Sequence, residues 1–536
     1  MLAGYAKGLT ETHAPVVSLP GSRSMRYAMG ITIVFGFVCI VLISWAYFHG
    51  AVMVQDEGML LAYPGLVLRG KVQNLDFEYI YGPASLWTLA AAFKAFGTSV
   101  MTERFVGLIY RLLLAAGVYE FVRGGAGRGA ALAAAFTCAI LAIPEGLQAY
   151  AWFAGLACIV WSLAVLARAS TERAPFFWAG VLGGLAVLYR QDFVLPVALS
   201  SATWFVVQGR RHWRWFAVGV LLGVAPYGVV IAHAGFAAVW NGLFIDPVFR
   251  VRPRRWLPLP TLTSSVGRLL LATIVSSVGV TALAAWRLYR SRSRPGAARM
   301  LIGGAFAVGL LHQALQRADI VHVLQAACVG IPFAYLVVGD WPSVGEILQT
   351  RDRRRVLVTA TFVLAVVVVA VTSVMVPIGG AILAPFGVGA RQTSLVTRGE
   401  RGVPMSRRSA ADLSEFLRAI EPEIQPGRRL LVAPTDLART VNGAPFVYFL
   451  FPELEPATYF LEMSPGSVNR KGTRFAKDLS TADLVILTDR YAQWNEPNRS
   501  REMGDVAAMR MLESRFCPTV HVGEWTLFKP CTRRGP

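Results

Sequence analysis

Two adjacent carboxylates, Asp56 and Glu57, follow an apolar run from residue 31 to 48 that is long enough to cross a bilayer. A third carboxylate, Asp76, stands about twenty residues later in "KVQNLDFEYIYGP". A carboxylate at a membrane surface can accept the proton of a hydroxyl nucleophile, which is the work of a general base. Acids also favour helix N-termini, so Asp56 and Glu57 equally fit as caps of a helix that begins near Gly58.

Arginines stand in three later segments of the chain. Two segments combine an arginine with an acid: "YRQDF" holds Arg190 and Asp192, and "LQRADIVH" holds Arg317, Asp319 and His322. The third, "FIDPVFRVRPRRWLPLP", holds an arginine group made of Arg250, Arg252, Arg254 and Arg255. Guanidinium forks match phosphate oxygens, so these arginines are candidate ligands of a lipid phosphate.

Each of these sets has a second interpretation. The arginine group would also suit nonspecific contact with anionic lipid headgroups. Arg190 with Asp192, and Arg317 with Asp319, would also serve as helix-end ion pairs, although charges at membrane depth are costly and often functional. Asp192, Asp319 and His322 are therefore candidate substrate-binding residues, with a structural histidine as the alternative for His322. A general base close to arginines that bind a phosphate suits the transfer of a group from a phosphate-linked lipid to a hydroxyl group.

The elements that position these residues are predicted membrane spans. Of the 536 residues, 55% are hydrophobic and 16% are charged, and the mean hydropathy is +0.49. A soluble domain carries about 25% charged residues. We therefore expect a polytopic all-α membrane protein with about 11 spans, centred near residues 39, 113, 137, 159, 183, 201, 224, 276, 307, 329 and 366.

The net charge of +20 follows this topology. Arginines gather in short loops near residues 123–128, 168–173, 210–214, 287–299 and 351–355, on the side that a cytoplasmic N-terminus places inside the cell. No recognition motif accompanies them, so no nucleic-acid partner is expected. The candidate site residues then face outward. The alanine- and arginine-rich composition is typical of a bacterium with GC-rich DNA, so we expect a bacterial plasma membrane.

The first outer loop, about residues 49–103, contains two short apolar stretches, "GMLLAYPGLVLRG" and "YGPASLWTLAAAFKAFG". They are too short to span a bilayer, so we expect two helices that lie in the membrane interface. Glu78, between them, is expected to be a solvated loop charge.

Composition changes near residue 390, where helical and strand patterns alternate. We predict a cytoplasmic lead-in over 1–27, a transmembrane domain over 28–389 and an extracytoplasmic α/β domain over 390–536. Its predicted elements are a helix at 406–420, strands at 428–434 and 481–490, a helix at 504–516 and a final hairpin. Cys517 and Cys531 flank this hairpin, and the sequence leaves open whether they form a disulfide.

The acidic pair "QDEG" after the first span, then "DFEYIYGP" and "ERFVGLIYRLLLAAGVYEFVR", resemble the GT-C superfamily of membrane glycosyltransferases. That superfamily includes protein O-mannosyltransferases and lipid A aminoarabinose transferases. The resemblance covers roughly residues 30–240. It implies that Asp56 is the catalytic base, Glu57 its neighbour and Asp76 a supporting acid. Arg190 would replace a lysine that many relatives carry at that turn as a phosphate partner.

The resemblance also implies the partners and the reaction. The donor would be a sugar on a polyprenyl phosphate, the acceptor a lipid, glycan or protein hydroxyl, and the displacement a single inverting step. No cofactor is expected, although Asp56, Glu57 and Asp76 are also suitable oxygen ligands for a divalent cation. The alternatives are a transporter of lipid-linked sugars, a polymerase or ligase of pyrophosphate-linked oligosaccharides, and a noncatalytic scaffold.

Overall fold

The computed structural model describes residues 45–52, 55–169, 172–251, 253, 256–290, 295–340, 353–383, 393–440, 442–465, 467–492 and 504–531. Most of the predicted first span lies outside these residues. So do three members of the arginine group, Arg252, Arg254 and Arg255.

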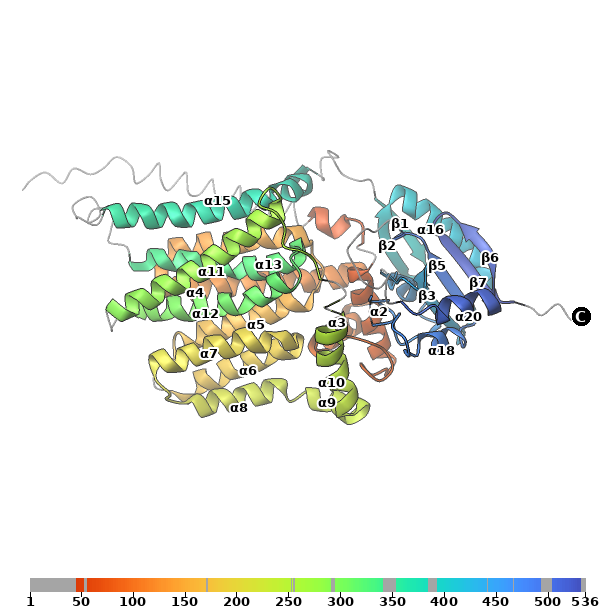
Figure 1. The fold of residues 1–536 in the computed structure, drawn as a ribbon, viewed down its shortest axis with the longest axis horizontal. Helices are drawn as coiled ribbons and strands as arrows, with labels where there is room; N and C mark the ends of the chain where they lie inside the picture. The colour runs from red at the N-terminus through yellow and green to blue at the C-terminus, as the bar shows by residue number, and fades with distance from the viewer. Residues whose placement is uncertain are drawn as a thin grey trace, which may run out of the picture.

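A bundle of long helices forms the first part of the molecule (Figure 1). Its helices are α4 (Val100–Ala142), α5 (Ala151–Leu166), α6 (Arg173–Tyr189), α7 (Val194–Gln208), α8 (Trp213–Val224), α9 (Tyr227–Ala234), α10 (Phe236–Trp240), α11 (Ser265–Arg290), α12 (Pro295–Gln316), α13 (Ile320–Gly330) and α15 (Arg353–Leu383). Short helices η1 (Ile143–Glu145), η2 (Gln191–Phe193) and η5 (Pro332–Asp340) and the π-helix η3 (Asn241–Val251) join them. Every predicted centre from residue 113 onward falls in a helix.

Among the described residues, four helices are long and apolar enough to cross a membrane, and a fifth span results if the bent pair α8–α9 is one span. The chain is thus a multi-pass membrane protein, and the total of eleven spans stays a prediction. Two predicted spans make up the segment labelled α4, which consists of two helices that meet at a kink at Gly127, where φ is 79°. Only glycine adopts that conformation readily.

Helices α2 (Asp56–Leu68) and α3 (Pro83–Phe96) occupy the first loop, as predicted. The interfacial position of α2 stays a prediction, and the structure adds that most of this helix lies in a protein core. Met59, Leu61 and Tyr63 belong to one apolar core with strands and helices of the C-terminal domain. A helix that is apolar on all sides needs such a covering. In Figure 1, α2 lies where the bundle meets the C-terminal domain.

The C-terminal domain is α/β, as predicted. A five-stranded sheet has the order β4-β3-β5-β7-β6. Its strands are β3 (Arg429–Pro434), β4 (Glu455–Pro456), β5 (Leu484–Thr488), β6 (Phe516–Val522) and β7 (Trp525–Pro530). Strands β3, β4 and β5 are parallel, and β7 is antiparallel to β5 and β6. A separate hairpin pairs β1 (Thr393–Arg398) with β2 (Arg401–Ser406).

The helices of this domain are α16 (Arg407–Ile420), η7 (Glu421–Glu423), α17 (Phe446–Leu450), α18 (Phe475–Leu479) and α20 (Ala507–Arg515). The predicted helices at 406–420 and 504–516 are confirmed as α16 and α20. Cys517 and Cys531 form a disulfide that closes the final hairpin.

Two close contacts dock the C-terminal domain on the first loop. A Cβ atom at Gly58 would lie 2.7 Å from the Phe446 nitrogen, so α2 and α17 approach backbone to backbone. Glu78 is 3% exposed, its amide donates to the Tyr459 carbonyl at 2.7 Å, and its carboxylate accepts from Ser467. The predicted solvation of Glu78 is therefore wrong. Burial raises the pKa of Glu78 to about 8.

Removing the disulfide should destabilise the C-terminal domain. The bridge joins residues separated by 14 positions, and a loop of about 15 residues contributes roughly 3 kcal/mol through the entropy of the unfolded chain. Cys517→Ser combined with Cys531→Ser should lower the unfolding temperature of the purified protein. A reducing agent should lower it in the wild type and leave it unchanged in the double variant. Equal unfolding temperatures of the two proteins without reductant would contradict this prediction.

Glu78 should make stability depend on pH. Its pKa in the folded protein is about 8, against 4.5 for the ordinary side chain, so the folded state binds the proton more tightly. Its contribution is complete below pH 4.5 and is lost as the pH rises through 8. The unfolding temperature should therefore fall between pH 5 and about 8, and Glu78→Gln should flatten that fall. Asp76→Asn, which changes an exposed carboxylate of the same loop, is the control and should keep the wild-type profile.

Candidate active site

Asp56 is the first residue of α2 and is half-buried at the junction of the two domains. The Tyr150 hydroxyl donates to Asp56 Oδ2 at 3.4 Å. Burial, followed by the negative charge of Asp56, raises the pKa of Tyr150 well above its ordinary value. Tyr150 therefore remains a neutral hydrogen-bond donor. Asp56 is the acceptor, at the end of the bundle that meets the C-terminal domain.

Glu57 has different surroundings from its neighbour. Its side chain is fully buried and holds Arg104 of α4 by two hydrogen bonds, of 2.6 Å from Nε and 3.0 Å from Nη2. Arg104 Nη1 also donates to the carbonyls of Tyr47, Phe48 and Gly50, each at 2.9 Å. This buried pair fastens the start of α2 to α4 and to the chain that precedes it. The geometry favours a structural role for Glu57.

The turn between α4 and α5 brings a further carboxylate to the site. Glu145 is 5% exposed and lies within electrostatic reach of Arg111, Asp56 and Asp319. Arg111 donates to the carbonyls of Gln148 and Glu145, at 2.9 and 3.3 Å, and lies 3.8 Å over the Phe153 ring. These contacts fix the turn that carries Glu145 and Tyr150.

Arg317, Asp319 and His322 form one unit at the turn between α12 and α13. Asp319 is the N-cap of α13, and its Oδ1 accepts from the backbone nitrogen and ring Nδ1 of His322 at 2.9 and 2.8 Å. Its Oδ2 accepts from Arg317 Nε at 2.5 Å. Burial opposes ionisation of Asp319, but the bonds from His322 and the charge of Arg317 outweigh it and hold the pKa well below its ordinary value. One carboxylate thus orients Arg317, a candidate phosphate ligand, and His322, a candidate substrate-binding residue.

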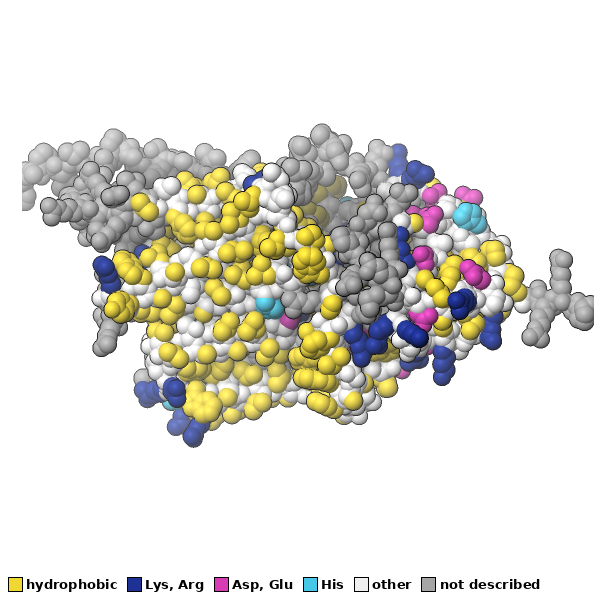
Figure 2. Space-filling view, viewed as in Figure 1, with side chains coloured by type: hydrophobic (Ala, Val, Ile, Leu, Met, Phe, Trp, Pro, Cys, Tyr) yellow, Lys and Arg dark blue, Asp and Glu magenta, His cyan; other side chains and the backbone are white. Residues whose placement is uncertain are grey.

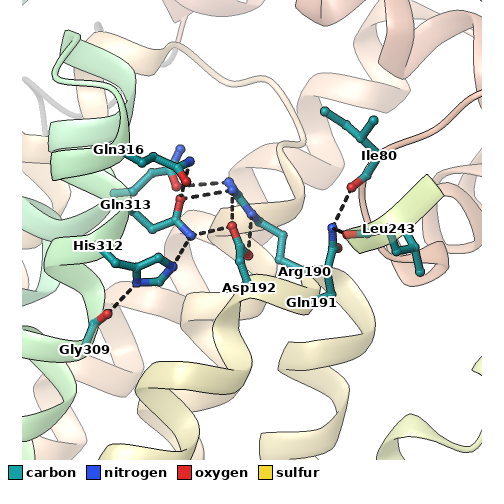
Figure 3. Close-up of polar contacts among 10 residues, drawn as sticks. Ile80, Arg190, Gln191, Asp192, Leu243, Gly309, His312, Gln313 and Gln316 are labelled. Atoms are coloured by element: carbon teal, nitrogen blue, oxygen red, sulfur yellow. Dashed lines mark hydrogen bonds and ion pairs between the residues drawn. The ribbon is translucent and has the colours of Figure 1, made fainter. Parts of the chain in front are cut away.

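Arg190 is the centre of a buried polar network (Figure 3). Its Nε and Nη2 donate to Asp192 at 3.1 and 2.6 Å, and it also donates to the amide oxygens of Gln325 at 3.0 Å and Gln313 at 3.2 Å. Gln313 in turn donates to Asp192. Arg190 is 6% exposed and its guanidinium lies 5.2 Å over the Tyr81 ring. The arrangement ties the turn after α6 to α12 and α13, and favours a structural role over a phosphate contact.

Two other predicted residues lie apart from Asp56. Asp76 is exposed beyond the far end of α2, a helix about 20 Å long, and its Oδ2 accepts from the Val72 amide at 2.7 Å. Arg250, the described member of the arginine group, pairs with Asp246 within η3. Asp246 acts electrostatically on Glu78 and Tyr459, which places this pair beside the docking contacts.

Asp56, Glu57 and Asp76, the alternative oxygen ligands for a divalent cation, do not converge, since Glu57 is held by Arg104 and Asp76 closes its own loop. Within the described part of the chain, no group of three or more His, Cys, Asp or Glu residues is placed to hold a metal ion.

The sequence interpretation missed Glu145, Tyr150, Arg104 and Glu103. Glu145 and Tyr150 lie in "IPEGLQAY", a polar break between two apolar runs. That break was the available signal. Arg104 and Glu103 begin a predicted span, where a charged pair at the end of a helix is easily interpreted as an anchor at the membrane surface.

No family model and no curated protein sequence matches the chain. Solved structures do resemble it. ArnT from Cupriavidus metallidurans bound to undecaprenyl phosphate gives a TM-score of 0.58 at 14% identity, over 95% of this chain and 100% of that one. The same protein in the apo state gives 0.56 at 13% identity, over 94% and 98%.

The oligosaccharyltransferase AglB from Archaeoglobus fulgidus, in complex with an inhibitory peptide and a dolichol-phosphate, gives a TM-score of 0.51 at 11% identity, over 91% of this chain and 74% of that one. Likeness at this level of identity establishes a shared fold. The chain therefore shares its fold with these two proteins, one of the aminoarabinose transferase type that the resemblance names.

Proposed function

We propose that the protein transfers a sugar from a polyprenyl-phosphate donor to a hydroxyl acceptor, with Asp56 as the general base. The observation that carries this proposal is the convergence of Asp56, Glu145 and the Arg317–Asp319–His322 unit at one end of the bundle. The GT-C fold shared with ArnT bound to undecaprenyl phosphate supports the same class of donor.

The chemistry of Asp56 suits proton removal. Its carboxylate is half-buried, so it is reachable by an acceptor hydroxyl, and Tyr150 orients it by a hydrogen bond. Transfer of the acceptor proton to Asp56 accompanies attack on the anomeric carbon, and the bond to the phosphate oxygen breaks on the opposite face. A single displacement of this kind inverts the anomeric centre. Glu145 is the neighbouring carboxylate that we expect to contact the acceptor or the sugar.

Arg317 and His322 supply the phosphate side of the site. Asp319 fixes the Nε edge of Arg317 and the Nδ1 edge of His322, which directs the remaining nitrogens of both groups away from Asp319. Donors that are oriented in advance stabilise the charge that develops on a leaving phosphate. Asp319 is therefore a positioning residue in this proposal, and Arg190 holds the same turn through Gln325.

We further propose that this site faces the outside of the cell, together with the C-terminal domain. Exposed Arg210 and Arg211 lie in the connection between α7 and α8, and exposed Arg214 lies in the first turn of α8, at the end of the bundle far from the C-terminal domain. Figure 2 shows basic side chains at that end and apolar side chains along the bundle. Positive charge marks the cytoplasmic end of spans. A transporter would place its polar groups near the bilayer midplane instead.

Asp56→Asn should abolish transfer while the protein still inserts and folds. General bases typically contribute 10²- to 10⁴-fold, so the rate should fall by about that factor. Mass spectrometry of polyprenyl-phosphate lipids and envelope glycans would compare a deletion strain complemented with wild type, Asp56→Asn or Asp76→Asn. We expect Asp56→Asn to accumulate one polyprenyl-phosphate sugar and lose one glycan, with Asp76→Asn close to wild type. Wild-type lipids and glycans in the strain with Asp56→Asn would show that Asp56 is only a helix cap and not the base.

Arg317→Ala should weaken donor binding and slow departure of the phosphate. A hydrogen bond to a charged group contributes about 1.5–3 kcal/mol, which corresponds to a loss of roughly 10- to 150-fold in kcat/KM for the donor. Arg317→Lys should recover only part of the loss, because lysine lacks the fork of two donors. Steady-state kinetics with a synthetic polyprenyl-phosphate sugar would measure both, and Arg474→Ala, at an exposed site of the C-terminal domain, is the control. Unchanged kcat/KM for the donor in Arg317→Ala would show that this residue does not bind the donor phosphate.

A further inference from the structure

Two consecutive residues near the start of α4, Glu103 and Arg104, are buried among the elements of the site. They are 0% and 1% exposed. Both side chains contact Glu57 of α2, Arg104 through an ion pair and Glu103 through a side-chain hydrogen bond. Arg104 thereby holds the start of α2. Glu103 also reaches the loop before α5 through its Oε1.

Glu103 holds the loop that carries the partners of Asp56. Its Oε1 accepts from the Ala149 amide at 2.5 Å. Ala149 immediately precedes Tyr150, whose hydroxyl donates to Asp56. Ala149 itself is fully buried, so its amide needs a protein acceptor.

These contacts connect Asp56 to Tyr150 through a continuous series of neighbouring residues. The series runs from Asp56 to its neighbour Glu57, from Glu57 to Arg104, from Glu103 to Ala149, and from Tyr150 back to Asp56. Both fixed points on α4 are adjacent residues of one rigid helical turn. A change at either residue therefore alters the separation between Asp56 and Tyr150.

We propose that Glu103 and Arg104 are paired positioning residues that set the distance from Asp56 to Tyr150 and Glu145. This inference rests on the proposed role of Asp56. Neither side chain contacts substrate in this proposal. Glu103 acts as a hydrogen-bond acceptor for one amide, so the neutral oxygen of glutamine serves the same purpose. Displacement of a catalytic group by about 1 Å can cost 10²-fold in rate, so a small shift of this loop has a large effect.

The test compares Glu103→Ala, Glu103→Leu and Glu103→Gln in the full-length protein. Alanine and leucine remove the acceptor, and leucine keeps most of the buried volume. We expect both to lower kcat by about 10- to 100-fold, the range found for residues that orient others, with the acceptor KM changed by less than about threefold. Glutamine should restore kcat to within about threefold of wild type. Glu120→Ala is the control, because Glu120 lies on the same helix and pairs with Arg123 and Arg168 away from the site.

Hydrogen exchange followed by mass spectrometry gives a readout that does not depend on activity. The peptide over residues 146–151 should exchange faster in the alanine and leucine variants and at the wild-type rate in Glu103→Gln. Wild-type kcat and exchange in Glu103→Leu would overturn the inference. Equal loss of kcat in Glu103→Gln and Glu103→Leu, with normal exchange in both, would also overturn it, because the charge and not the bond would matter.

Failure of the proposed function has a different signature. If the wild-type protein transfers no sugar from any polyprenyl-phosphate donor, the proposed function is wrong. The hydrogen-exchange measurements then still decide whether Glu103 fixes the loop over residues 146–151. If the wild type is active and Asp56→Asn remains active, Asp56 is not the base, whatever Glu103 does.

Discussion

The buried ion pair between Glu57 and Arg104 is the interaction on which the arrangement of the site depends. Removal of both charges from water is costly, and only close, well-directed contacts repay that cost. Here two hydrogen bonds join the pair, and three backbone carbonyls accept from Nη1 of the guanidinium. Substitution of one partner would leave the charge of the other unpaired in a core without water, which is strongly destabilising. The start of α2, and with it Asp56, is consequently held in one place.

The charged residues around this pair divide into two kinds. Glu57, Arg104 and Arg190 are buried, and they join helices that are distant in sequence. Asp56, Arg317 and His322 are half-buried at the mouth of the bundle. A membrane protein needs the first kind to hold its polar turns together without water. The second kind would contact the ligand in the function that we propose.

Much of the fold could be predicted from the sequence. Long apolar runs and short polar breaks predict a helical bundle because lipid requires every backbone group to bond internally. Alternating patterns after residue 390 predict the α/β domain, and Asp319 and Asp56 are placed at helix starts by their sequence context alone. The pairing of charges was beyond the sequence. Arg190 and Arg317 stand in similar local patterns, yet Arg190 joins α12 and α13 through Gln313 and Gln325, whereas Arg317 pairs with Asp319 of its own turn.

Long-range packing also explains why some site residues could not be predicted from the sequence. Glu78 and Asp76 stand two positions apart in one loop, and only the C-terminal domain, nearly 400 residues away in the chain, decides that Glu78 is buried. Glu145 lies in a turn of few residues, and its importance arises from elements that converge on that turn. Local sequence reports which residues carry charge, whereas long-range packing decides which charges meet.

The contact between Gly58 and Phe446 has a consequence for the order of biosynthesis. About 390 residues separate these positions, and a ribosome adds roughly 5–20 residues per second. Helix α2 therefore waits some 20–80 seconds after its synthesis before the segment that covers it exists. During this interval an apolar helix must be sheltered by lipid, by a chaperone or by the translocation machinery. The part of the protein that carries the proposed base is thus among the first to be made and among the last to be completed.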